Sequence, residues 1–333
     1  MENSVLKVNE LCVQFQTSAG LVTAINNLSF ELKQQETLCL VGESGSGKSV
    51  TALTVMGLLP KPAGIVSHGT IELEGQNLLS YSEAQMQRVR GNKVSMIFQE
   101  PMTTLNPVYK VGDQICEALL RHRKMTKKEA MEYAGELLNK VRIADAKRRL
   151  KQYPHELSGG LRQRVMISMA LACNPKILIA DEPTTALDVT VQAQVLRLLE
   201  ELKEEFKMSV IFITHDLGVV SEIADRIIVM YGGMKMEEGP TDALFSHPVH
   251  PYTKGLINCT PKMEGEERRL PTIPGMVPSL AKMPKGCHFC NRCTLAKERC
   301  METPPKMTEY EPHHYVACYE QEKGGATDAR EDL

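Results

Sequence analysis

The eight residues Gly42–Ser49 limit the folds open to this chain, because they have the spacing G-x-x-x-x-G-K-S. They follow the apolar run Leu38–Val41, which is typical of a buried strand, and precede residues 50–59, which are typical of a helix. Glycines in such a loop let backbone N–H groups curl around phosphate oxygens, and the helix N-terminus adds favourable partial charge. Lys48 can then reach the β- and γ-phosphates, and the Ser49 hydroxyl can bind Mg²⁺. The pattern therefore predicts a nucleotide-binding loop.

Composition excludes several classes of protein. The 333 residues contain 39 Lys and Arg against 41 Asp and Glu, so no overall basic field points to nucleic acid. Apolar runs such as Val165–Cys173 are shorter than the roughly 18 residues typical of a membrane span. The first residues lack the basic and then apolar pattern of a secretory signal. We expect a cytosolic protein that reaches a membrane only through its partners.

Strands and helices alternate along much of the chain. The basic groups at 121–128 and 147–151 lack interleaved aromatic residues, which favours a solvated helix face over a nucleic-acid site. Periodicity predicts strands at Leu6–Phe15, Val22–Leu32, Gly69–Leu73, Val94–Phe98, Lys176–Ala180, Ser209–Thr214, Ile223–Tyr231 and Lys235–Gly239, and helices at Val111–Arg123, Lys127–Val141 and Val191–Phe206.

Polar residues follow three of these apolar strands. Asp181 and Glu182 end one strand, where Asp181 can hold Mg²⁺ and Glu182 can polarise an attacking water. Gln99 and His215 end two others, although a lone glutamine or histidine is more often structural. Ligands of parallel sheets bind at the carboxyl ends of the strands, so we expect these side chains to meet near the γ-phosphate.

Two further features are weaker by themselves. The segment Leu157–Gly160 precedes an apolar helix that runs to Ala172, so a second phosphate could dock at that helix N-terminus. Phe15 ends a predicted strand, where its ring could stack on adenine or simply belong to the core.

The ten cysteines fall into two groups. Five are scattered, mostly in apolar surroundings, and are most simply buried thiols: Cys12, Cys39, Cys116, Cys173 and Cys259. The others crowd near the C-terminus: Cys287, Cys290, Cys293, Cys300 and Cys318. In a cytosolic protein, metal explains such crowding better than disulfides. An iron–sulfur cluster, Zn²⁺ and free thiols are all consistent with this grouping, and His288, His313 and His314 are further candidate ligands for Zn²⁺.

Taken in order over residues 5–260, these motifs resemble the ATP-binding subunit of ABC transporters. Gly42–Ser49 is similar to Walker A, Gln99 to the Q-loop, Leu157–Gly160 to the signature, Ile177–Glu182 to Walker B, Ala186–Asp188 to the D-loop and His215 to the switch histidine. The resemblance implies an α/β P-loop NTPase fold with a parallel core sheet, an antiparallel β subdomain, a helical subdomain at about 101–160, and a small cysteine-rich C-terminal extension.

The same resemblance implies the roles of individual residues. Catalysis would use Glu182, His215 and Gln99, and Mg²⁺ would be held by Ser49, Gln99 and Asp181. Leu157, Ser158, Gly159 and Gly160 would contact the ATP of a partner. ATP itself would be bound by Phe15, Gly42, Glu43, Ser44, Gly45, Ser46, Gly47, Lys48, Ser49 and Val50.

Residues Ile97–Pro107 and His250–Thr253 are similar to the oligopeptide/dipeptide/nickel importer ATPases. That resemblance implies a second, related ATPase in a heterodimer, two membrane permeases and an extracytoplasmic binding protein, with this chain on the cytoplasmic face of the membrane. It also implies a [4Fe–4S] cluster on Cys287, Cys293, Cys300 and Cys318, although Cys290 offers an alternative ligand. We expect an ATPase domain over 1–255, the extension over 256–323, and a disordered tail over 324–333.

Three functions compete on this evidence. The first is ATP-driven import of di- or oligopeptides, or of a related solute such as nickel. The second is a non-transport ABC ATPase that acts on nucleic acid or the ribosome, and the third is a redox sensor that carries a cluster. Coiled-coil arms, zinc insertions and tandem ATPase halves are typical of the second class, and the sequence has none of them.

Overall fold

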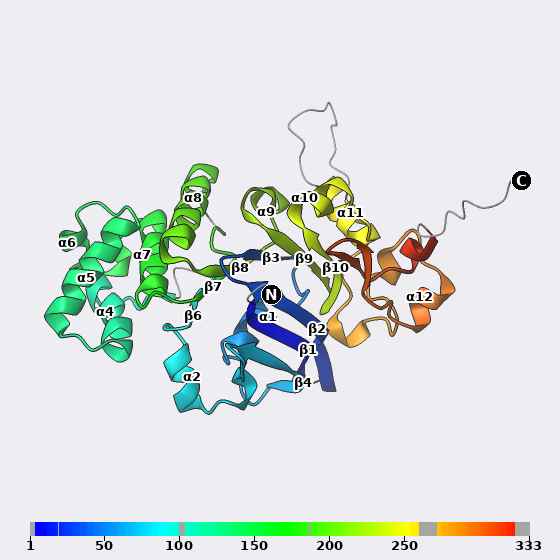
Figure 1. The fold of residues 1–333 in the computed structure, drawn as a ribbon, viewed down its shortest axis with the longest axis horizontal. Coiled ribbons are helices and arrows are strands. Elements are labelled where there is room, and N and C mark those ends of the chain that lie inside the picture. Colours follow the sequence, from blue (N-terminus) through cyan, green and yellow to red (C-terminus); the bar gives the residue numbers. More distant parts are fainter. Residues whose placement is uncertain (1–3, 19, 100–103, 186, 260–271, 324–333) are drawn as a thin grey trace, which may run out of the picture.

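The central feature of the fold is a twisted sheet with a parallel core (Figure 1). The computed structural model describes residues 4–18, 20–99, 104–185, 187–259 and 272–323. Within these residues, eight strands form this sheet in the order β11-β12-β10-β9-β3-β8-β7-β6. The parallel strands are β3 (Thr37–Val41), β6 (Val94–Ile97), β7 (Ile177–Asp181), β8 (Ser209–Thr214) and β9 (Arg226–Tyr231). The antiparallel edge consists of β10 (Met234–Pro240), β12 (His314–Val316) and β11 (Thr308–Glu311).

A second, antiparallel sheet has the order β2-β1-β4-β5. Its strands are β1 (Ser4–Thr17), β2 (Gly20–Lys33), β4 (Gly64–Leu73) and β5 (Gln76–Asn77). The helix α1 (Lys48–Val55) follows β3, and its buried residues Ala52 and Val55 pack in the same core as this second sheet.

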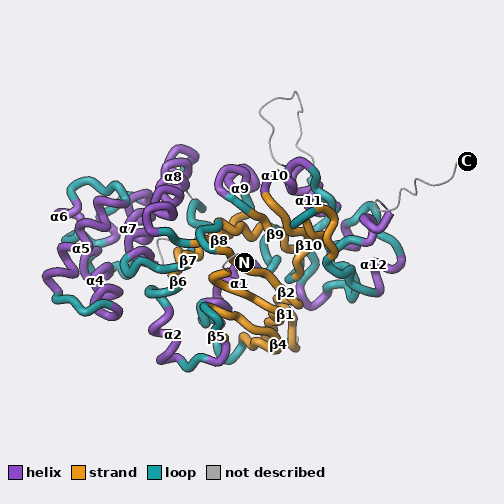
Figure 2. Tube along the Cα trace, in the orientation of Figure 1, coloured by secondary structure: helices purple, strands orange, loops and turns teal. Residues whose placement is uncertain are grey.

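The helices form groups on both sides of the central sheet (Figures 1 and 2). One group lies at one end of the molecule's long axis and contains α4 (Val111–His122), α5 (Lys127–Lys140), α6 (Ala146–Arg149) and α7 (Gly159–Leu171). The C-terminal extension, with α12 (Glu298–Glu302), lies at the opposite end. The other α-helices of the described residues are α2 (Glu83–Val89), α8 (Val189–Phe206), α9 (Leu217–Ile223), α10 (Thr241–Ser246) and α11 (Pro251–Asn258).

Strand β3 shows why the sheet has a core on each face. Successive side chains of a strand point to opposite sides, and every residue of β3 is buried. Leu38 and Leu40 join the cluster shared with the antiparallel sheet, whereas Cys39 and Val41 join the cluster shared with the helical group. A continuous apolar run is therefore what a strand covered on both faces requires.

The structure confirms the predicted α/β fold with its parallel core sheet. Ile223 was predicted to begin a strand but ends α9, and the strand β9 begins at Arg226. Sequence periodicity also missed β12, which pairs with β10 and so adds a strand of the extension to the central sheet. The predicted boundary between residues 255 and 256 falls inside α11 and stays a prediction.

Several predicted features fall outside the described residues: Ala186 of the D-loop motif, residues 100–103 of the importer-like motif, and the C-terminal tail 324–333. No helix among the residues that the structure describes has both the length and the apolarity needed to cross a bilayer.

Candidate active site

The predicted phosphate-binding loop, Gly42–Ser49, joins the carboxyl end of β3 to the N-terminus of α1. A side chain at Gly42 is excluded, because a Cβ there would lie 2.1 Å from the carbonyl oxygen of Met230. Gly47 has a φ of +101°, a conformation that L-residues rarely adopt. Both glycines are therefore required by the backbone. Ser44 and Gly45 are exposed, while Ser46, Gly47 and Lys48 are buried, and Val50 is half-buried in the first turn of α1.

Lys48 folds back onto its own loop. Its Nζ donates to the carbonyl oxygens of Gly42, at 2.7 Å, and of Glu43, at 3.1 Å. Burial lowers the pKa of Lys48, and the nearby carboxylates of Glu182, Asp181 and Glu43 act in the opposite direction. The loop thus holds the ammonium group of Lys48 against its own backbone carbonyl oxygens.

Asp181 reaches the loop from the end of β7, two strands away from β3 in the sheet. Its Oδ1 accepts a hydrogen bond of 3.1 Å from the hydroxyl of Ser49. Burial raises the pKa of Asp181, although the hydrogen bond from Ser49 opposes that shift. A hydroxyl and a carboxylate oxygen at this separation are a donor set suited to Mg²⁺.

Glu182 is the centre of the second polar group. Its Oε2 accepts hydrogen bonds from Nε2 of Gln99, at 2.9 Å, and from the hydroxyl of Thr185, at 3.0 Å. Its Oε1 lies 3.2 Å from Nδ1 of His215. Burial acts to raise the pKa of Glu182, but the contacts with Thr185 and His215 and the charge of Lys48 hold that pKa below its ordinary value.

The structure therefore brings together Lys48, Ser49, Gln99, Asp181, Glu182 and His215, which sequence analysis had placed near one phosphate. They come from the ends of β3, β6, β7 and β8, four neighbours in the parallel sheet. Glu182 also has a φ of +45°, and its N–H donates to the carbonyl of Ile213 at 2.9 Å. An ionised carboxylate beside a bound triphosphate can orient and polarise a water for attack.

The signature segment lies elsewhere. Ser158 is the N-cap of α7, and Leu157 is buried while Ser158 and Gly159 are exposed. Among the described residues, no hydrogen bond joins Leu157–Gly160 to the phosphate-binding loop. The helix α7 belongs to the helical group at one end of the molecule (Figure 1). The contact of this segment with a partner's nucleotide stays a prediction.

Phe15 lies near the end of β1, where it pairs with Val22 and Gly64 in the antiparallel sheet. The ring is half-buried and packs against the apolar cluster of that sheet. Both interpretations from the sequence, adenine stacking and core packing, fit this position, so the adenine-stacking role stays a prediction.

The five C-terminal cysteines line one small cavity of about 20 Å³. Burial raises the pKa of Cys287 to about 12, and it also raises the pKa values of Cys290, Cys293 and Cys318. Within the described residues, no three His, Cys, Asp or Glu side chains are arranged as a metal-binding group. The predicted [4Fe–4S] or Zn²⁺ site is thus a cluster of thiols around a space for about one water.

Two of the three histidines that are candidate zinc ligands contact other groups. Nδ1 of His288 lies 2.7 Å from the carbonyl oxygen of Gly232, and Nε2 of His314 lies 2.7 Å from a carboxylate oxygen of Glu237. His313 is exposed. Instead His250 lines the cysteine cavity. This position of His250 could not be predicted from the sequence, because its neighbours in the chain give no sign of this long-range contact.

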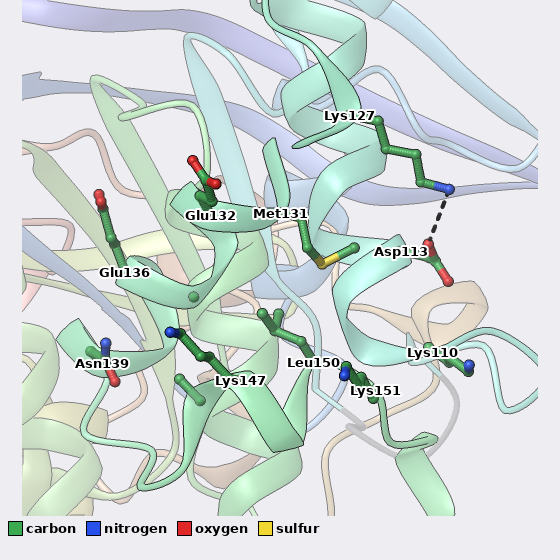
Figure 3. Close-up of a pocket in the computed structure, with 12 residues that line it drawn as sticks. Lys110, Asp113, Lys127, Met131, Glu132, Glu136, Asn139, Lys147, Leu150 and Lys151 are labelled. Atoms are coloured by element: carbon green, nitrogen blue, oxygen red, sulfur yellow. Dashed lines mark ion pairs between the residues drawn. The ribbon is translucent and has the colours of Figure 1, made fainter. Parts of the chain in front are cut away.

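A cavity of about 680 Å³ is a groove in the helical group between α4, α5 and α6 (Figure 3). Met131 and Leu150 give it an apolar floor, and Lys127 and Asp113 form an ion pair of 3.6 Å at its rim. The groove contains none of the predicted site residues. It is therefore separate from the phosphate-binding loop.

Known proteins and families match nearly the whole chain. Residues 25–185 match the family described as ABC transporter, and residues 236–300 match the oligopeptide/dipeptide transporter C-terminal region. The oligopeptide transport ATP-binding protein AppD of Bacillus subtilis is 49% identical over 97% of this chain and 99% of its own. The oligopeptide transport ATP-binding protein OppD of Salmonella typhimurium is 50% identical over 95% of this chain and 94% of its own.

Solved structures show the same fold. The dimeric ATP-binding cassette MJ0796, bound to ADP and Pi in a post-hydrolysis state, matches with a TM-score of 0.63 and 28% identity over 71% of this chain and 98% of its own. The cbiO1 protein of Clostridium perfringens, part of an ABC transporter complex, matches with a TM-score of 0.62 and 26% identity over 74% of this chain and 92% of its own.

Proposed function

This chain belongs to the ATP-binding subunits of ABC transporters, and we propose that it hydrolyses ATP to power the import of di- or oligopeptides across a membrane. Identity near one half over almost the full length of two oligopeptide transport ATP-binding proteins supports the peptide as cargo. The proposed ATP hydrolysis rests on two sets of contacts at the ends of the parallel strands. Ser49 is hydrogen-bonded to Asp181. Glu182 contacts both Gln99 and His215.

The chemistry proposed for the site follows from these contacts. The loop Gly42–Ser49 binds the phosphates, and Lys48 exchanges its backbone carbonyl partners for phosphate oxygens. Ser49 and Asp181 would hold Mg²⁺, which supplies charge neutralisation at the phosphates when bound. Glu182, ionised and held by its neighbours, orients a water toward the γ-phosphate, while His215 stabilises the arrangement of that carboxylate.

We propose that the site is completed by a second, homologous ATPase subunit. The separation of Leu157–Gly160 from the chain's own phosphate-binding loop supports this, because the exposed Ser158 and Gly159 at the start of α7 can then face a partner's nucleotide. The dimeric state of the matching MJ0796 cassette gives the proposal further support. We propose that the two ATPase subunits form a heterodimer, which binds two membrane permeases on the cytoplasmic face of the membrane. An extracytoplasmic binding protein would complete this assembly.

The cargo is tested in the assembled transporter. The chain is co-expressed with its neighbouring permeases and second ATPase, reconstituted in vesicles and supplied with the binding protein. Peptide-stimulated ATP hydrolysis and uptake of labelled peptide are the expected results. Stimulation by Ni²⁺ in place of peptides would favour the nickel alternative. Failure to co-purify with any membrane protein would favour a non-transport ATPase or a redox sensor.

We further propose a metal cofactor on the C-terminal cysteines. Five thiols around one cavity support it, as does His250, which lines the same cavity. The Nδ1 atom of His250 accepts a hydrogen bond of 3.0 Å from the backbone N–H of Tyr252, so the proton of the ring is on Nε2. This buried Nε2–H of His250 has no hydrogen-bond partner among the described residues. Cys287, Cys293, Cys300 and Cys318 would hold a [4Fe–4S] cluster, or alternatively Zn²⁺, which when bound would cross-link the extension.

Anaerobic purification followed by iron, sulfide and zinc analysis tests this cofactor. About four irons and four sulfides per chain, with a visible absorption band, are expected for the wild-type protein. Cys290→Ser should keep the cluster, and Cys300→Ser should lose it. Loss in Cys290→Ser would assign that residue as a ligand, and wild-type protein free of iron and zinc would contradict the proposal.

A further inference from the structure

The C-terminal extension reaches the phosphate-binding loop through one side chain. Arg292 ends the short 3₁₀ helix Cys290–Arg292, which begins at one of the clustered cysteines and is followed directly by another, Cys293. Its Nη1 lies 2.9 Å and 3.1 Å from the two carboxylate oxygens of Glu43, the second residue of the loop. The side chain of Arg292 is only 6% exposed, against 31% for Glu43. This ion pair is therefore largely removed from water on the arginine side.

Contacts other than the ion pair with Glu43 also hold the guanidinium of Arg292 in place. Its Nε donates to the carbonyl oxygen of Pro274 at 2.8 Å, and its Nη2 donates to that of Ile273 at 3.2 Å. Its Nη1 also lies 3.3 Å from the hydroxyl of Tyr231, and its Cζ lies 5.7 and 6.0 Å from the ring centroids of Tyr231 and Phe289. A guanidinium held by so many partners presents its charge in a single position.

Glu43 is held at three points as a result. Arg292 binds its carboxylate, the hydroxyl of Tyr252 accepts from its N–H at 2.9 Å, and Lys48 donates to its carbonyl oxygen at 3.1 Å. Two of these three partners, Tyr252 and Arg292, come from outside the nucleotide-binding core of the chain, in α11 and the extension. The first turn of the loop is thus shaped in part by distant C-terminal residues.

The ion pair between Arg292 and Glu43 matters for ATP binding because Glu43 is negatively charged. Glu43 places a carboxylate in a loop built to receive a polyanion, and its charge acts on Lys48. Without a compensating cation, such a carboxylate repels the phosphates and competes for the loop's lysine. Arg292 neutralises the carboxylate and draws it toward the extension, away from the hydrogen bonds of the loop backbone.

We propose that Arg292 is a positioning residue for ATP: by binding Glu43 it shapes and neutralises the phosphate-binding loop, so that ATP affinity depends on the folded C-terminal extension. The proposal rests on the proposed assignment of Gly42–Ser49 as the ATP-binding loop. It gives the extension a role in the nucleotide site whether or not its cysteines hold metal.

The test compares charge with structure in the full-length chain. The dissociation constant for ATP with Mg²⁺ is measured by displacement of a fluorescent ATP analogue, and folding is followed by thermal unfolding. We expect Arg292→Gln to weaken ATP binding about tenfold, because Glu43 is left uncompensated. Glu43→Gln should bind ATP at least about threefold more tightly than Arg292→Gln, because no unpaired carboxylate remains beside the phosphates.

The double variant separates the two explanations. Glu43→Gln with Arg292→Gln still lacks the bonds to Pro274 and Ile273, but it has no unpaired carboxylate. We expect it to bind ATP at least about threefold more tightly than Arg292→Gln alone. Equal weakness of the double variant and Arg292→Gln would overturn the proposal in favour of a purely structural arginine, as would unaltered ATP binding in Arg292→Gln.

Two controls complete the design. Arg299→Gln removes an arginine of the same extension whose guanidinium lies 4.1 Å from the ring centroid of Tyr319, and it should leave ATP affinity unchanged. A loss as large as that of Arg292→Gln would contradict a specific role for Arg292. Lys48→Ala tests the loop itself: unaltered ATP binding in that variant would refute the proposed ATP site, whatever the Arg292 variants do.

Discussion

Oε1 of Glu182 and Nδ1 of His215 lie 3.2 Å apart, and they come from the ends of two neighbouring parallel strands. The side chain of Glu182 is only 16% exposed, whereas that of His215 is 65% exposed. The carboxylate is therefore held by the protein interior, while its histidine partner is largely exposed to solvent.

Replacing Glu182 by Gln tests the carboxylate as the group that acts on water. The amide keeps the size of the side chain but cannot accept a proton, so the turnover number should fall at least about 100-fold. ATP affinity should stay near the wild-type value, because the phosphate contacts of the loop are unchanged. Steady-state hydrolysis and equilibrium ATP binding are measured on the assembled complex. Hydrolysis at the wild-type rate would exclude the proposed role.

Replacing Asp181 by Asn tests the Mg²⁺ site. The hydrogen bond from Ser49 can persist, but the charge that attracts the cation is lost. The Mg²⁺ concentration for half-maximal hydrolysis should rise by about tenfold, the effect of losing about 1.5 kcal/mol from a charged contact. Asp113→Asn, at the exposed ion pair with Lys127, serves as the control and should leave the Mg²⁺ dependence unaltered. An unshifted Mg²⁺ curve in Asp181→Asn would argue against this ligand.

Replacing Gly42 by Ala tests the steric requirement at the start of the loop. The new methyl group would approach the carbonyl oxygen of Met230 to 2.1 Å, so the backbone must move. We expect a loss of about 3 kcal/mol in the free energy of unfolding, together with weaker ATP binding. Gly75→Ala is the control, since its φ is +77° but its Cβ would have no neighbour within 4 Å. Equal losses in the two variants would show that dihedral strain alone is responsible.

Replacing Glu237 by Ala tests how the extension is attached to the ATPase core. This fully buried carboxylate accepts from the N–H groups of Val249 and His250, at 2.8 and 2.9 Å, and lies 2.7 Å from Nε2 of His314 in β12. Removing the carboxylate leaves these buried donors without an acceptor. The free energy of unfolding, measured in urea, should therefore fall by about 3–5 kcal/mol.

Glu201→Ala provides the comparison for that measurement. Glu201 forms an exposed ion pair with Arg142, and its loss should change the free energy of unfolding by less than about 1 kcal/mol. A similar, small loss in both variants would mean that the buried carboxylate does not secure β12 to β10.

The sequence by itself determined the parallel α/β core, the loop Gly42–Ser49 between a strand and a helix, and the strand ends that carry Gln99, Asp181 and His215. These features are local: a glycine pattern, an apolar run of strand length and a polar residue after it need no distant contact to be recognised. The same reasoning misplaced Ile223, because Ile223 and Ala224 are apolar and only the two charged residues 225 and 226 separate them from the apolar run Ile227–Tyr231.

Only the tertiary structure decided which distant residues meet. It joined Arg292 to Glu43 across 249 positions, brought His250 to the cysteine cavity, and turned His288 and His314 away from it toward Gly232 and Glu237. Such pairings depend on how whole elements pack, and a charged or aromatic side chain has no local pattern that names its partner. The loop is visible in the sequence, but its support from the C-terminal extension is a property of the folded chain.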